Sequence, residues 1–119
     1  AAASASTEKD APAKHAKRRL RQRRSEIVNA RSRKVKPLEK KIAAAEKAIE
    51  AAEQDLNRHS QEMAAAAGNG DGDRIADLSR AIHQTQTNIE RFYSQLDQLC
   101  ADLESLQAKF DTQLERLEH

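Results

Sequence analysis

The sequence predicts an all-α fold: a two-helix antiparallel coiled-coil hairpin with a basic N-terminal helical extension, kinked near Pro37. Three observations lead to it. The 119 residues are rich in helix formers but only 3% aromatic, with 3 Gly and 2 Pro, which argues against a globular core and against an all-β fold. Apolar residues recur at alternating steps of three and four in two long stretches, and all three glycines lie between those stretches.

We predict two segments in the N-terminal third of the chain. Residues 1–12 have no apolar periodicity, and their Ala, Ser, Thr and Lys content predicts a flexible linker. Residues 13–36 are helix formers and predict a basic helical lead-in. Because Pro37 lacks a backbone donor and its ring meets the carbonyl of Arg33, we expect a kink or a break near residues 35–36.

Residues 37–67 predict the first coiled-coil helix, because their apolar side chains form a heptad seam. Continued backwards, this seam includes Val35 and Val28, with Arg31 on it as well. Its positions are Leu38, Ile42, Ala45, Ile49, Ala52, Leu56, His59, Met63 and Ala66.

We predict that residues 68–72 form the turn between the two helices. We expect Gly68 to take the left-handed conformation that ends a helix, and Asp71 or Asp73 to cap the next helix. The Asn69–Asp73 segment is a poor calcium loop, since Arg74 and Arg80 stand where such a loop needs Gly and Glu.

Residues 73–116 predict the second coiled-coil helix, and its seam matches the first in antiparallel register. The residue numbers of facing positions keep a constant sum, from Ala66 opposite Ile75 to Val35 opposite Leu106. We therefore expect a monomeric hairpin instead of a parallel dimer. Residues 117–119 resemble the start of a Leu-Glu-polyHis purification tag. The second seam comprises Ile75, Leu78, Ile82, Thr85, Ile89, Phe92, Leu96, Leu99, Leu103, Leu106 and Phe110.

The net charge of +2 averages two unlike parts: residues 1–40 carry +9 and residues 41–119 carry −7. Seven of the eleven residues from Lys14 to Arg24 are Lys or Arg, and none is acidic. Such a run predicts sequence-independent contact with nucleic-acid phosphates, and the alternative is a solvated basic linker. The candidate binding residues are Lys14, Lys17, Arg18, Arg19, Arg21, Arg23, Arg24, Arg31, Arg33 and Lys34.

Other functional classes find little support in the sequence. No nucleophile, base and orienting group are arranged together, so we expect no catalytic residue, metal site or cofactor within this chain. The single Cys100 forms no disulfide framework and suits a reducing compartment. Apolar runs such as residues 64–67 are far too short to span a membrane. Only Tyr93 among the aromatic residues lies off the seam, so base stacking is a poor prospect.

Several stretches resemble the C-terminal coiled-coil domain of ABC-F ATPases, including the Uup-like branch. They are the Arg-rich lead-in, Lys36-Pro37-Leu38, and the Asp73–Arg80 sequence after the turn. The stretch Ile89–Leu99 also resembles that domain, with Tyr93 at its common Tyr and Leu96 where Trp is common.

The resemblance, which covers about residues 14–115, implies a specific context. ABC-F proteins are soluble, cytoplasmic ATPases that act at the ribosome in translation, and the Uup-like branch is also linked to DNA. The chain would then be an accessory arm that contacts DNA or ribosomal RNA, with the ATP-binding domains in the parent protein. The alternative is a structural module whose acidic face, with Glu90, Asp97 and Glu104, docks a protein partner or the parent's own ATPase domains.

Overall fold

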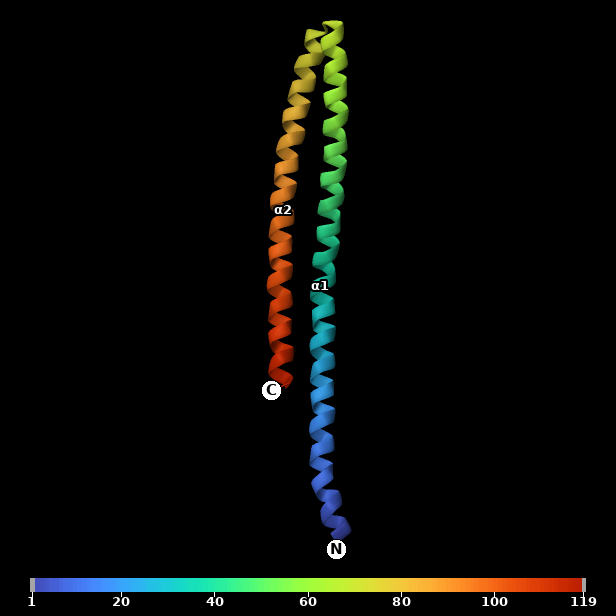
Figure 1. Ribbon diagram of the computed structural model, residues 1–119, viewed down its shortest axis with the longest axis vertical. Coiled ribbons are helices and arrows are strands. Elements are labelled where there is room, and N and C mark those ends of the chain that lie inside the picture. The colour runs from blue at the N-terminus through green and yellow to red at the C-terminus, as the bar shows by residue number, and fades with distance from the viewer. Residues whose placement is uncertain (1, 119) are drawn as a thin grey trace. The chain divides into compact units, whose positions relative to one another are not determined.

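Two α-helices account for the part of the chain that the structure describes. The computed structural model describes the backbone of residues 2–118 and the side chains of residues 13–118. Helix α1 comprises Ala2–Asn69 and helix α2 comprises Gly72–Glu118, with no strand in residues 2–118. The fold is therefore an all-α antiparallel helical hairpin, as the sequence predicts (Figure 1).

The hairpin divides into two compact units, each built from a segment of α1 beside a segment of α2. Unit 1 comprises Ala1–Pro37 with Leu103–His119, and unit 2 comprises Leu38–Asp102. Within each unit the two segments run antiparallel (Figure 1). The candidate binding residues all belong to unit 1, whereas the turn belongs to unit 2.

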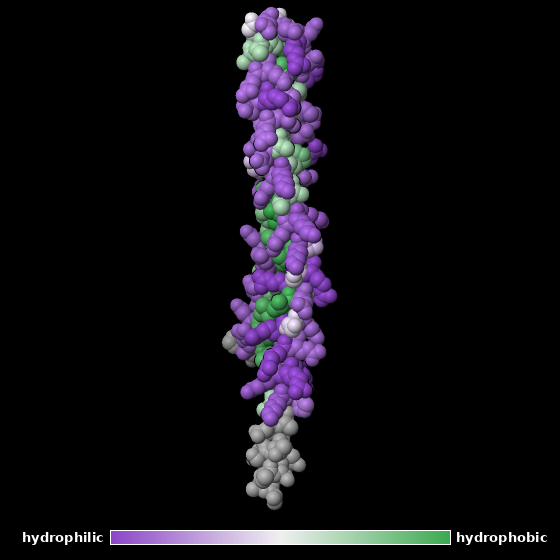
Figure 2. All heavy atoms as spheres, turned by 90° about the vertical axis from the view of Figure 1, so that its right-hand side faces the viewer, coloured by the Kyte–Doolittle hydropathy of each residue, from purple (hydrophilic) through white to green (hydrophobic). Residues whose placement is uncertain are grey.

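The most buried of the described side chains all lie on the predicted seams. Val35 and Phe110 are 7% and 3% exposed in unit 1, and Ile49, Ala66 and Leu78 are 6%, 5% and 3% exposed in unit 2. Two helices cannot enclose a side chain from all directions, so most other seam residues are only half-buried. Figure 2 shows the apolar side chains as narrow patches between hydrophilic ones.

One predicted seam position is wrong. Val28 is 48% exposed, whereas its neighbour Ile27 is half-buried. In this segment the covered face follows steps of four, from Val35 through Arg31 to Ile27, so a heptad continued backwards to residue 28 is one residue out of phase. Arg31 is half-buried, as expected for a charged residue on the seam.

The course of α1 differs from the prediction in residues 2–12, and of the kink or break predicted near Pro37 the break does not occur. The helix begins at Ala2, where the composition of residues 1–12 predicts a flexible linker. Ala, Glu and Lys have high helix propensity, so this segment can be helical although it has no apolar periodicity. The helix also runs without a break through Pro37, which removes only one hydrogen bond, to Arg33. Burial of Val35, two residues before the proline, helps to offset that loss.

The turn between the helices is formed by Gly70 and Asp71. Gly70 has a φ of 67°, and its N–H donates to the Ala67 carbonyl while the Asp71 N–H donates to the Ala66 carbonyl. This pair of bonds is the Schellman arrangement, with Gly70 at the left-handed position. The prediction that Gly68 takes this position is wrong, because Gly68 continues α1.

Asp71 also caps α2, which confirms one of the two predicted caps. Its Oδ1 accepts a hydrogen bond of 3.1 Å from the backbone N–H of Arg74. The carboxylate thereby satisfies a donor that the first turn of the helix leaves free. Asp73 lies in the same first turn, where its negative charge suits the positive end of the helix dipole.

Candidate nucleic-acid interface

Four cations of the basic run lie on one side of α1, which we call the first basic face. Their side chains follow the spacing i, i+3, i+4 and i+7, so successive turns of the helix bring them side by side. They surround one shallow depression in unit 1, and all four are exposed. These residues are Lys14, Lys17, Arg18 and Arg21.

A second basic face lies on another side of the same helix. Arg19 and Arg23 are one turn apart and line a depression together with Ala16 and Leu20. Leu20 is 39% exposed. The sequence prediction named both arginines as candidates. It did not assign them to a different side of the helix from the four residues of the first basic face.

Two of the candidate arginines have acidic partners on α2. The Arg24 Nη2 donates to Glu118 Oε1 at 3.0 Å, and the Arg31 Nη1 donates to Asp111 Oδ1 at 2.9 Å. Both pairs belong to unit 1 and connect α1 to α2. A phosphate would have to compete with these carboxylates, so Arg24 and Arg31 are less available than the cations of the two basic faces.

A further cationic group follows in the same helix. Arg33 and Lys34 are exposed, and no described residue forms an ion pair with either. Lys36 is also exposed and adds a third cation. The prediction missed Lys36, although the lack of acidic residues between Glu26 and Glu39 was a signal for it.

The cations of the two basic faces are not neutralised within the part of the chain that is described. Each ion pair of the described residues joins partners other than these six side chains. Like charges at neighbouring helix positions repel one another, and this repulsion is relieved when an anion approaches. The arrangement is chemically suited to bind a polyanion.

The aromatic residues offer little for stacking on bases. Phe110 is 3% exposed, and Phe92 is half-buried on the seam. Tyr93 is 45% exposed, but its hydroxyl donates to Glu53 Oε1 at 2.9 Å in unit 2. Contact through phosphates is therefore favoured over contact through bases.

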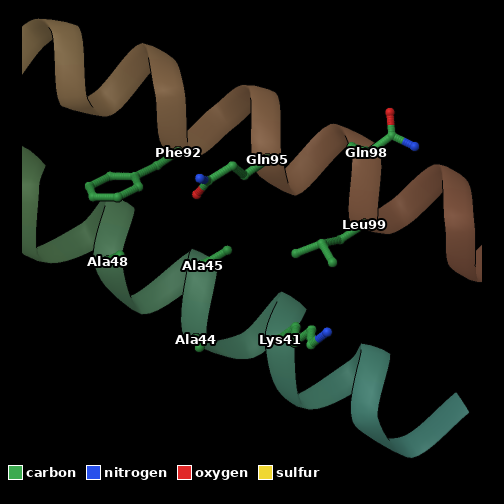
Figure 3. Close-up of a pocket in the computed structure, with 8 residues that line it drawn as sticks. All are labelled: Lys41, Ala44, Ala45, Ala48, Phe92, Gln95, Gln98 and Leu99. Atoms are coloured by element: carbon green, nitrogen blue, oxygen red, sulfur yellow. The ribbon is translucent and has the colours of Figure 1, made fainter.

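Unit 2 contains an apolar groove between its two helix segments, with a volume of about 510 Å³. Figure 3 shows Phe92 and Leu99 of α2 directed toward α1, where Ala45 and Ala48 leave space, while Gln98 points away. The sequence prediction did not identify this groove. The remaining lining residues are Lys41, Ala44 and Gln95.

A polar cluster occupies the part of unit 2 nearest the turn. Glu62 accepts a hydrogen bond of 3.0 Å from Arg74 across the two helices, and its carboxylate lies 3.9 Å from Arg58. The His59 Nδ1 is 4.0 Å from Glu62 and has no hydrogen-bond partner. The contact between Glu62 and Arg74 connects the two helices near the turn. Among the described residues, no group of three side chains could hold a metal ion.

Comparison with known proteins adds no relative to this picture. No family model, no curated protein and no solved structure matches the chain. Within the described residues, neither helix has a stretch long and apolar enough to cross a membrane.

Proposed function

We propose that this chain is a non-catalytic accessory arm that binds nucleic acid through phosphates, without reading sequence. The observation that carries the proposal is the exposed run of cations on α1, in which six side chains lie outside every described ion pair. Lys and Arg that neutralise phosphates release condensed counterions, and this release drives the binding. No cofactor takes part in such an interaction.

The wider context of the proposal is a cytoplasmic ABC-F ATPase that acts in translation or on DNA. Its support is the resemblance of the lead-in, the Asp73–Arg80 stretch and the Ile89–Leu99 stretch to that family's C-terminal coiled coil. ATP would bind to domains of the parent protein. Sequencing the gene upstream of Ala1 tests this context, which requires a Gly-rich phosphate-binding loop there.

The binding itself is tested with a fluorescently labelled duplex and the chain of 119 residues. Binding should be measurable at about 50 mM salt and weaken about a thousandfold by about 200 mM, if six phosphates are neutralised. Replacing Arg18, Arg19, Arg21, Arg23 and Arg24 together by Ala should abolish it. The absence of binding by the parent chain at low salt refutes the proposal.

The control variant removes the same number of charges elsewhere. Lys40, Lys47, Arg58, Arg80 and Arg91 are exposed cations of unit 2, and replacing all five by Ala should leave most of the binding intact. Equal losses in the two variants would mean that only the net charge matters.

The second candidate function is docking of a protein partner on the acidic face of α2. Glu90 and Asp97 are exposed and lie outside the ion pairs of the described residues, which leaves their charges available. Reversing the charge of Glu90, Asp97 and Glu104 should then impair association with the partner more than loss of the arginines does. Capture of nucleic acid by the reversed variant at unchanged affinity supports the first proposal instead.

A further inference from the structure

The two basic faces lie on opposite sides of α1. At about 100° per residue, the centre of the first basic face and the centre of the second are about 180° apart around the helix axis. Every side chain from residue 13 to residue 26 is exposed, so neither face is covered by another described part of the chain. A single row of phosphates can reach only one of the two faces.

A groove with phosphates along both edges can reach both faces at once. We propose that residues 13–23 of α1 lie in the major groove of B-form duplex DNA, with one basic face against the phosphates of each strand. The proposal rests on the proposed function and names the nucleic acid that the same site takes.

The dimensions of helix and groove agree. An α-helix with its side chains is about 10–12 Å across, and the B-form major groove is about 12 Å wide. Long Lys and Arg side chains on opposite sides of the helix therefore extend to the groove edges, where the phosphates lie. Ala16 and Leu20, beside the second basic face, are uncharged and place no unpaired charge in the groove.

The same geometry disfavours other nucleic acids. The major groove of A-form RNA is deep and narrow, so a helix with its side chains does not enter it. A single strand presents one phosphate track and leaves the opposite basic face unused. Binding to double-stranded RNA or to single-stranded DNA should thus engage only part of the charge.

The first experiment compares ligands with the intact chain at about 50 mM salt. Fluorescence anisotropy is measured with a DNA duplex, an RNA duplex and a single DNA strand of equal length. We expect the DNA duplex to bind about tenfold or more tightly than the other two. Equal affinity for the two duplexes overturns the groove inference but leaves the proposed function standing, whereas no binding to any ligand overturns both.

The second experiment compares the two faces with matched variants. Arg18→Gln with Arg21→Gln removes two charges from the first basic face, and Arg19→Gln with Arg23→Gln removes two from the second. Each double variant should weaken duplex binding and lower the slope of log K against log salt by about 1.8. A loss confined to one variant means that a single face contacts the phosphates and overturns the inference.

The control for the second experiment carries the same change of charge in unit 2. Lys40→Gln with Lys47→Gln alters two exposed cations away from both basic faces and should change affinity less than twofold. Circular dichroism of all three variants should show unchanged helicity, because Gln, Lys and Arg have similar helix propensities.

Discussion

The guanidinium of Arg31 donates to the carboxylate of Asp111 at 2.9 Å, joining residues that are 80 positions apart in the chain. The predicted register places Arg31 opposite Phe110, the residue immediately before Asp111. The contact therefore agrees with the antiparallel alignment predicted from the two seams. The second ion pair of unit 1, between Arg24 and Glu118, has the same offset from that alignment.

The ion pair of Arg31 and Asp111 should contribute little to stability. Both side chains are accessible, at 32% and 61%, so water and salt weaken the attraction. A double-mutant cycle with Arg31→Ala and Asp111→Ala should give a coupling energy of about 0.2–1 kcal/mol from urea unfolding at low salt. The coupling should decrease in about 1 M salt, and a coupling that is independent of salt would contradict this account.

Truncation of a buried seam residue should have a much larger effect. Leu78 is 3% exposed, so Leu78→Ala removes apolar contacts and should destabilise the chain by about 2–3 kcal/mol in urea unfolding. The control is Leu20→Ala, the same substitution at a position that is 39% exposed, where we expect a change within about 0.5 kcal/mol. Similar values for the two variants would show that Leu78 is not part of the core.

Two glycines near the turn should respond in opposite directions to alanine. Gly70 has a φ of 67°, so Gly70→Ala strains the backbone and should destabilise the chain by about 1–2 kcal/mol. Gly68 lies in α1 with no atom within 4 Å of an added Cβ, so Gly68→Ala should stabilise it by about 0.5–1 kcal/mol. Thermal unfolding measures both, and the reverse order would place the left-handed residue at Gly68.

The only tyrosine gives a direct test of one hydrogen bond. The pKa of Tyr93 is raised above its ordinary value of 10.0, first by the hydrogen bond to Glu53 and then by the negative charge of that carboxylate. Because the folded chain favours the neutral phenol, this contribution to stability is present below pH 10 and is lost as the pH rises through the raised pKa.

Absorbance at the tyrosinate band measures this titration without interference, since the chain has no Trp. Glu53→Ala should lower the midpoint toward the ordinary value because it removes both the acceptor and the charge. Glu50→Ala removes a carboxylate of the same helix that does not contact Tyr93. It should leave the raised midpoint of the parent chain unchanged. Identical midpoints for the parent and Glu53→Ala would exclude the hydrogen bond.

The sequence was sufficient to predict the two helices from residue 13 onward and most of their contact positions. Steps of three and four place Val35, Ile49 and Leu78 on the seam, and the structure confirms their burial. A constant sum of residue numbers defines the antiparallel register because the helical rise is the same in both helices. The error at Val28 arises where apolar residues become sparse and two adjacent positions fit the pattern equally well.

The arrangement of the candidate site was harder to predict. Composition identifies the cations, but it does not show which of them have partners. Arg24 and Arg31 have partners because α2 returns beside them with Glu118 and Asp111, and this depends on tertiary alignment. The position of the left-handed glycine was similarly ambiguous, since Gly68, Gly70 and Gly72 all occur within the turn region and only the hydrogen bonds distinguish them.

The shallow burial of the seam determines how the molecule opens. No described side chain is less than 2% exposed, so no single cluster of residues holds all the others in place. Within each unit, a layer of side chains contacts mainly the layers before and after it, as in a linear repeat protein. Amide hydrogen exchange should accordingly show a gradient of protection along the helices, and not one protection factor common to all core amides. A destabilising substitution in one layer should lower protection only in that layer and its neighbours.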